Sequence, residues 1–99
     1  MEIKKDTKGT SLTLSLAGRL DAKAARELDK ELKSALDGVS ELTIDFRDLI
    51  YVASAGLRSL LTAQKRMESQ GSMKILHVAP QIREVFELTG FTEFLQIEN

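Results

Sequence analysis

Ser54 is the residue of this chain whose type and position best suit chemistry. It follows a segment of alternating apolar residues, 42–46, and it precedes a segment with apolar residues at helical spacing, 57–67. A helix start has backbone N–H groups without partners and the positive end of the helix dipole. A hydroxyl there can cap the helix, and it can also carry a phosphate, which that end of a helix attracts. The spacing alone leaves both interpretations open.

The neighbours of Ser54 are small. The side chains around it project little from the surface, since they belong to Ala53, Ala55 and Gly56. A partner protein can therefore pack closely against this segment. A phosphate on Ser54 adds bulk and nearly two negative charges to this near-neutral patch. We therefore expect a phosphate to block binding of a partner, and we assign Ala53, Ser54, Ala55 and Gly56 to a partner-binding surface.

A second candidate segment, 18–21, lies between the preceding strand and its helix. Asp21 is a favourable N-cap for a helix that begins at Ala22, which is its structural interpretation. Successive βα connections lie at the same edge of a parallel sheet, so segment 18–21 is expected close to segment 53–57. Functional residues concentrate on such connections, and Asp21 therefore also belongs to the predicted partner-binding surface.

Three arginines accompany the two segments. Arg58 lies one helical turn after Ser54 on the same face, and Arg19 and Arg47 flank the connections. Each is a solvated cation in the simpler interpretation. Together they suit an acidic partner or the phosphate itself, and Arg19 and Arg58 are assigned to the partner-binding surface.

The residue counts argue against an enzyme. The single histidine, His77, has neither a second histidine nor a cysteine to accompany it, so a Ser-His-acid triad at Ser54 is not expected. A thiolate or multi-histidine metal site is excluded, although a site made of carboxylates alone is not. The chain also lacks a phosphate-cradling glycine loop. We therefore predict no catalytic residue, no metal and no cofactor.

Size and charge bound the remaining classes. The 99 residues, 1–99, make a single domain, and the net charge of −1 argues against nucleic acid as a partner. The sequence shows no leader peptide and no apolar run near the length of a membrane span. The expectation is a cytoplasmic protein without a membrane partner, either a monomer or a weak dimer.

The periodicity predicts an α/β fold of order β-β-α-β-α-β-α-β. The expected elements are an N-terminal hairpin (2–5 and 11–17), helices 22–36, 54–70 and 80–89, and strands 41–46, 73–78 and 94–97. When parallel strands are joined by right-handed crossovers and lie in the sheet in the order of the sequence, all the connecting helices lie on the same face of the sheet. The alternating strands favour one wet face, so we predict a mixed sheet of about five strands, in sequential order, with helices mainly on one face. Phe86, Phe91 and Phe94 are expected to fill the core after the last helix.

The chain resembles the STAS domain of bacterial anti-sigma-factor antagonists, which also occurs in sulfate transporters. The resemblance covers nearly the whole chain. It depends on the segments Gly18-Arg19-Leu20-Asp21, Leu42-Thr43-Ile44-Asp45-Phe46, Tyr51-Val52-Ala53-Ser54-Ala55-Gly56-Leu57 and Val85-Phe86-Glu87-Leu88-Thr89-Gly90-Phe91.

This resemblance implies a partner switch. In the family, the unmodified antagonist binds an anti-sigma factor that is also a serine kinase, and this binding releases the sigma factor. The kinase phosphorylates the serine that matches Ser54, the modified antagonist dissociates, and a phosphatase resets it.

One residue departs from the family pattern. The family usually has aspartate before the serine, and this chain has Ala53. The loss of that carboxylate leaves two alternatives open: a STAS interaction module that is not phosphorylated, and a sensor that binds a small ligand or nucleotide at the helix start.

Overall fold

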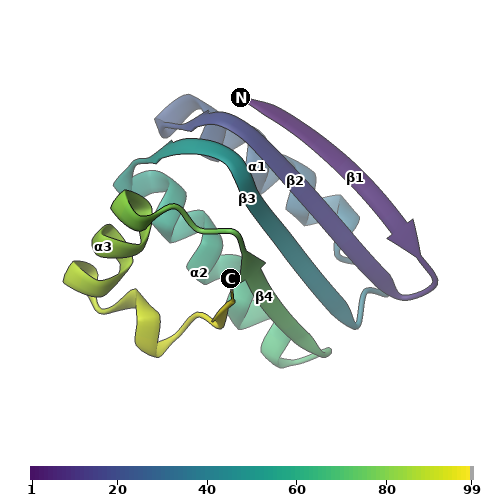
Figure 1. Ribbon diagram of the computed structural model, residues 1–99. Helices are drawn as coiled ribbons and strands as arrows, with labels where there is room; N and C mark the ends of the chain where they lie inside the picture. Colours follow the sequence, from purple (N-terminus) through teal and green to yellow (C-terminus); the bar gives the residue numbers. More distant parts are fainter. Residues whose placement is uncertain (99) are drawn as a thin grey trace.

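The computed structural model describes residues 1–98, which form a five-stranded mixed sheet with three α-helices (Figure 1). The strands lie in the sequential order β1-β2-β3-β4-β5. β1 runs antiparallel to β2, and every other neighbouring pair is parallel. The elements are β1 (Glu2–Lys8), β2 (Ser11–Leu20), α1 (Ala22–Ala35), β3 (Glu41–Val52), α2 (Ser54–Glu68), β4 (Ser72–Leu76), α3 (Pro80–Thr89), a 3₁₀ turn η1 (Phe91–Glu93) and β5 (Ile97–Glu98). The predicted fold class, element order and strand order are confirmed.

One face of the sheet carries the core. Leu14, Ile44 and Ile75 lie side by side in β2, β3 and β4 and are inaccessible to solvent. Figure 1 shows α1 and α2 together behind the sheet, and Phe86 of α3 meets Phe46 of β3 with 6.2 Å between ring centroids. All three helices therefore cover the same face, as the alternating strands predict.

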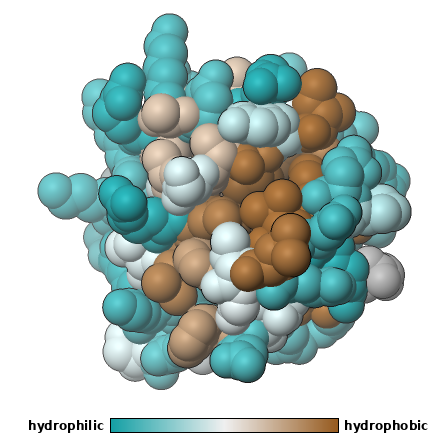
Figure 2. Space-filling view, turned by 90° about the vertical axis from the view of Figure 1, so that its left-hand side faces the viewer, coloured by the Kyte–Doolittle hydropathy of each residue, from teal (hydrophilic) through white to brown (hydrophobic). Residues whose placement is uncertain are grey.

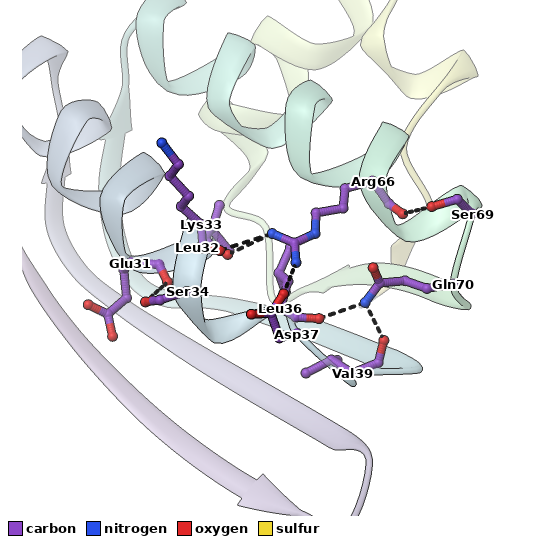
Figure 3. A network of polar contacts seen from close by, with 10 residues as sticks. All are labelled: Glu31, Leu32, Lys33, Ser34, Leu36, Asp37, Val39, Arg66, Ser69 and Gln70. Carbon is purple, nitrogen blue, oxygen red and sulfur yellow. Dashed lines mark hydrogen bonds and ion pairs between the residues drawn. The ribbon is translucent and has the colours of Figure 1, made fainter.

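Hydrogen bonds and an ion pair join the C-terminal end of α1 to α2 and to the residue Gln70 after α2 (Figure 3). Arg66 donates to the backbone oxygen of Lys33 and pairs with Asp37 at 2.6 Å, and Gln70 donates to the backbone oxygens of Leu36 and Val39. These donors satisfy carbonyl groups that a helix end leaves without partners. The two helices are thus joined at the end of the molecule away from Ser54.

The strands β2 and β3 are longer than predicted. The segment 18–21, expected as a turn, continues β2 to Leu20, and β3 passes the predicted end at Phe46 and reaches Val52. β3 carries one extra residue relative to β2 between Asp45 and Asp48, and another between Leu49 and Tyr51. These two β-bulges interrupt the period-two alternation by which a strand is recognised, which explains why the prediction ended too early.

The C-terminal region also differs from the prediction. α3 ends at Thr89, as predicted, and Gly90 follows it in the left-handed conformation (φ 77°). Residues 91–93, however, form η1, and the last strand is only Ile97–Glu98. Phe86 lies in the core, whereas Phe94 is 59% exposed, so the prediction that Phe94 fills the core is wrong. After η1, Leu95 is the residue that is buried in the core, in place of Phe94.

Candidate functional site

The carboxyl ends of β2 and β3 hold the two predicted segments together. The backbone N–H of Ala53 donates to the backbone oxygen of Leu20 at 2.8 Å, and Leu20 lies opposite Val52 in the sheet. Segment 18–21 and the start of α2 are therefore neighbours, as expected from the parallel pairing.

Gly56 permits the first turn of α2 to lie against β2. A Cβ atom at Gly56 would lie 2.6 Å from Cγ of Leu20, which is closer than packing allows, and 3.2 Å from the backbone oxygen of Leu20, which is an unusually tight contact. Gly56 is itself buried. Its contribution to the predicted surface is therefore to position Ser54, rather than to contact a partner directly.

Ser54 is exposed and is the first residue of α2. The N-cap is Ala53, in an extended conformation (φ −85°, ψ 167°), so the interpretation of Ser54 as the N-cap is wrong. Ala53 has no side-chain oxygen, and within residues 1–98 no side chain caps this end of α2. The positive end of the α2 dipole and its free N–H groups are thus open beside the Ser54 hydroxyl.

Asp21 caps α1, as predicted. Its Oδ1 accepts the backbone N–H of Ala24 at 2.9 Å. This hydrogen bond, with help from the N-terminal amino group and Arg19, outweighs the small effect of burial and holds the pKa of Asp21 below its usual value. α1 and α2 therefore start side by side, one capped by a carboxylate and the other uncapped.

Two exposed apolar residues beside Ser54 were missed by the sequence analysis. Ile50 is 62% exposed and Tyr51 is 39% exposed, because the second bulge of β3 turns both toward solvent. The guanidinium of Arg19 lies 4.2 Å from the centroid of the Tyr51 ring, a cation–π contact that orders both side chains. The signal available in the sequence was the break in alternation between residues 46 and 52.

These residues together define the Ser54 surface. Arg58 adds an exposed cation one turn along α2. The Ser54 surface consists of Arg19, Asp21, Ile50, Tyr51, Ala53, Ser54, Ala55 and Arg58. It combines a hydroxyl, small residues, an ordered aromatic ring and two cations, which suits protein binding more than catalysis.

Arg47 and His77 belong to a different cluster, on the open face of the sheet. The imidazole of His77 contacts Asp45 through Nδ1 at 2.9 Å and Arg47 through Nε2 at 3.2 Å. Both ring nitrogens are therefore engaged, and neither is free to activate Ser54 as a base. Arg47 is directed to this cluster, not to the Ser54 surface.

Asp45 is the acceptor at the centre of this cluster. Its Oδ1 accepts from His77 and from the backbone N–H of Arg47. Burial raises the pKa of Asp45, but these hydrogen bonds and the nearby positive charges outweigh burial and hold it below the usual value.

We expect Asp45 to stabilise the fold at neutral pH and to lose this contribution in acid. Because its pKa is lower in the folded chain than in the unfolded chain, the contribution is complete above about pH 5 and disappears as the pH falls through the folded pKa. Urea unfolding of the wild type between pH 7 and pH 3 should show this loss, and Asp45→Asn should show a shallower dependence. Equal slopes in the two proteins would contradict the assignment.

The comparison with known proteins decides the family. A family model described as "Mlab, STAS domain" matches residues 3–97, which is nearly the whole chain. The chain belongs to the STAS domain family.

Two relatives of this STAS domain are named as anti-sigma factor antagonists. It is 32% identical to the "Putative anti-sigma factor antagonist BtrV" of Bordetella bronchiseptica, over 100% of this chain and 87% of that protein. It is 26% identical to the "Anti-sigma-B factor antagonist" of Bacillus subtilis, over 87% of this chain and 80% of that protein. This family is regulatory rather than enzymatic, in agreement with the expectation from the sequence.

Solved structures agree on the fold. The STAS domain superposes on the unphosphorylated antagonist SpoIIAA with a TM-score of 0.80 at 19% identity, covering 99% of this chain and 88% of that one. It superposes on the phosphorylated form of Bacillus SpoIIAA with a TM-score of 0.78 at 20% identity, covering 99% and 92%. Among the helices in residues 1–98, none combines the length and the apolar character that a membrane-spanning helix needs.

Proposed function

We propose that this STAS domain is an anti-sigma factor antagonist that binds, through the Ser54 surface, an anti-sigma factor that is also a serine kinase. Phosphorylation of Ser54 then releases the partner. The observation that carries the proposal is the exposed hydroxyl of Ser54 on the first residue of an uncapped helix, between two alanines and beside exposed Ile50 and Tyr51. In this cycle the domain acts in the cytoplasm as a monomer or weak dimer, and a phosphatase resets it.

In the unmodified state, the surface suits close protein packing. The side chains of Ala53 and Ala55 leave room for a partner to approach the backbone of α2. The Tyr51 ring, ordered by Arg19, is an amphipathic anchor of the type that is enriched at protein interfaces. The exposed Arg58 favours a partner with acidic residues facing it.

In the modified state, the same geometry favours the phosphate and opposes the partner. The first backbone N–H groups of α2 precede the first helical bond, which Leu57 donates to Ala53, and they are available to phosphate oxygens. A phosphate held there occupies the space into which the partner packs. The likeness of the chain to both forms of SpoIIAA supports a switch that acts by local charge and bulk while the fold stays the same.

Phosphorylation at one residue tests the proposal directly. Incubation with ATP and a serine-kinase anti-sigma factor from the same genome should add one phosphate, measured by intact mass, and peptide mapping should place it on Ser54. Ser54→Ala should remain unmodified, while Ser59→Ala, at a buried serine of the same helix, should be modified as the wild type is. Phosphorylation of Ser54→Ala at the wild-type rate would contradict the site assignment.

A cap introduced at Ala53 should stabilise the protein. Ala53 has the extended backbone of an N-cap, so Ala53→Asp supplies the side-chain acceptor that α2 lacks, and the free energy of unfolding should rise by about 1 kcal/mol. Urea denaturation at pH 7 measures this change. Ala53→Asn is the matched control, since it caps without a charge; its gain should be smaller, because the dipole contributes about 0.3–1 kcal/mol for Asp alone. No gain in either variant would show that the N-terminus of α2 is already satisfied.

The second candidate function is a STAS interaction module without a phosphorylation cycle. Ala53, in place of the usual aspartate, favours it because kinase recognition of the serine then loses a neighbouring carboxylate. Intact-mass analysis of the protein purified from its native cells separates the two functions. A phosphorylated fraction under any growth condition supports the switch, and its absence under all conditions supports the module.

A further inference from the structure

Two large apolar side chains stand exposed on α3 and just after η1. Leu88 is 81% exposed and Phe94 is 59% exposed. Figure 2, which views the molecule from the side where α3 lies in Figure 1, shows hydrophobic residues gathered near the centre of this face with hydrophilic residues around them. A gathering of this kind commonly marks a protein interface.

The local structure holds these side chains outward. Ile82 and Phe86 bury the inner side of α3, which leaves Leu88 on its outer side. The left-handed Gly90 and the hydrogen bonds from Phe94 and Leu95 to the backbone oxygen of Phe91 fix the turn. Phe94 is therefore presented by an ordered segment, so little conformational freedom is lost when it is buried.

Acidic residues lie close to these two side chains along the chain. Glu84, Glu87 and Glu93 are exposed, and within residues 1–98 only Glu87 of the three forms an ion pair, with Arg83 at 3.4 Å. We call Glu84, Glu87, Leu88, Glu93 and Phe94 the α3 ridge. Its chemistry complements a partner surface with an apolar pocket flanked by lysine or arginine.

The Ser54 surface alone is too small for a stable complex. It has eight residues, whereas a specific protein interface takes about 20–30 residues from each partner. Figure 1 shows the end of β3, the start of α2 and α3 on the same side of the molecule. The α3 ridge is thus placed to supply part of the missing contact area.

From this we infer that the anti-sigma factor bound at the Ser54 surface extends over α3 and takes Leu88 and Phe94 into a basic-rimmed apolar pocket. This inference depends on the proposed function. It assigns the ridge a constant contribution to affinity, which phosphorylation of Ser54 does not alter. The Ser54 surface then supplies the switch, and the ridge supplies part of the affinity in both states.

Truncation of the two apolar side chains tests the contact. The double variant Leu88→Ser/Phe94→Ser should bind a serine-kinase anti-sigma factor from the same genome at least about tenfold more weakly in calorimetric titration. Leu88→Met/Phe94→Leu is the matched control, which keeps the ridge apolar and should bind within about threefold of the wild type. Both pairs alter exposed residues, and thermal unfolding verifies that each variant is folded.

Charge reversal tests the rim. Glu84→Lys/Glu93→Lys should slow association with the same anti-sigma factor at low salt by about tenfold, and the difference should shrink in 0.5 M salt. Glu27→Lys/Glu68→Lys changes the net charge equally at exposed positions of α1 and α2, and it should have a smaller effect. Equal effects of the two pairs would overturn the local role of the rim.

The outcomes separate this inference from the proposed function. If the serine double variant binds as the wild type does while Ser54→Asp weakens binding, the ridge is not part of the interface and the proposed function stands. If neither changes the affinity, the proposed function fails. If the ridge variant weakens binding of unmodified and phosphorylated protein by the same factor, the ridge inference is supported.

Discussion

Phosphorylation of Ser54 is expected to weaken the binding of the anti-sigma factor by about a hundredfold, which is about 2.7 kcal/mol. The phosphate brings nearly two negative charges to a residue whose unmodified side chain, in the proposed complex, packs against the partner. A partner that faces Arg58 with acidic residues then meets repulsion from the phosphate, and burying the phosphate against such a partner adds a desolvation cost. Isothermal titration of the stoichiometrically phosphorylated protein against the unmodified protein, at fixed salt, measures the change.

Two substitutions at Ser54 divide the effect of the phosphate into charge and bulk. Ser54→Asp adds one charge and little bulk, so affinity should fall at least about tenfold, or 1.4 kcal/mol. The side chain of Ser54→Asn is nearly the same size as that of Ser54→Asp but has no charge, so Ser54→Asn should bind the partner within about threefold of the wild type. An unchanged affinity in both the phosphorylated protein and Ser54→Asp would remove the switch from the mechanism.

The fold could be predicted where its pattern is local to each element. The alternation of Leu12, Leu14 and Leu16 in one strand, and of Leu42 and Ile44 in another, indicated one wet face. One wet face, combined with right-handed crossovers, fixed the strand order and the side on which the helices lie. The ends of β2 and β3 could not be predicted this way, because the bulges of β3 exist only when the strand pairs with β2.

The same distinction applies to the site. Asp21 and Ser54 were located correctly at helix starts, since capping and helical periodicity are read within a few residues. The role of Ser54 as the cap was wrong because the helix begins one residue earlier than a serine cap requires, and Ala53 takes that place. Ile50 and Tyr51 were missed because their exposure is a consequence of the second bulge, which depends on a distant strand.

Gly71, which follows α2, shows that a glycine after a helix can be required for an unexpected reason. The second helix, predicted to end at residue 70, ends at Glu68. A glycine that follows a helix usually supplies the left-handed conformation. Gly9, Gly18, Gly38 and Gly90 have positive φ angles, but Gly71 is not among them. A Cβ at residue 71 would instead lie 1.8 Å from the backbone oxygen of Ser40. The need for glycine is therefore steric and comes from a loop more than thirty residues away.

Gly71→Ala should accordingly be the most destabilising of the substitutions considered for this protein. The backbone oxygen of Ser40 also accepts the N–H of Ser72 at 2.9 Å, and this bond starts the pairing of β3 with β4. Since a backbone atom cannot move aside as the end of a side chain can, the added methyl must displace this junction, and we expect a loss of about 3 kcal/mol. For a domain of this size that lowers the melting temperature by roughly 12–24 °C.

Gly90→Ala is the matched control for this prediction, because Gly90 has a positive φ but no atom within 4 Å of a new Cβ. The strained backbone alone should cost about 1–2 kcal/mol, measured by the same urea denaturation. A larger loss for Gly71→Ala than for Gly90→Ala identifies close packing, rather than backbone conformation, as the reason for glycine at residue 71. The reverse order would mean that the junction between the α1–β3 loop and β4 yields easily. The start of the β3–β4 pairing would then be a flexible point of the sheet, although the other end of β3 holds the Ser54 surface in place.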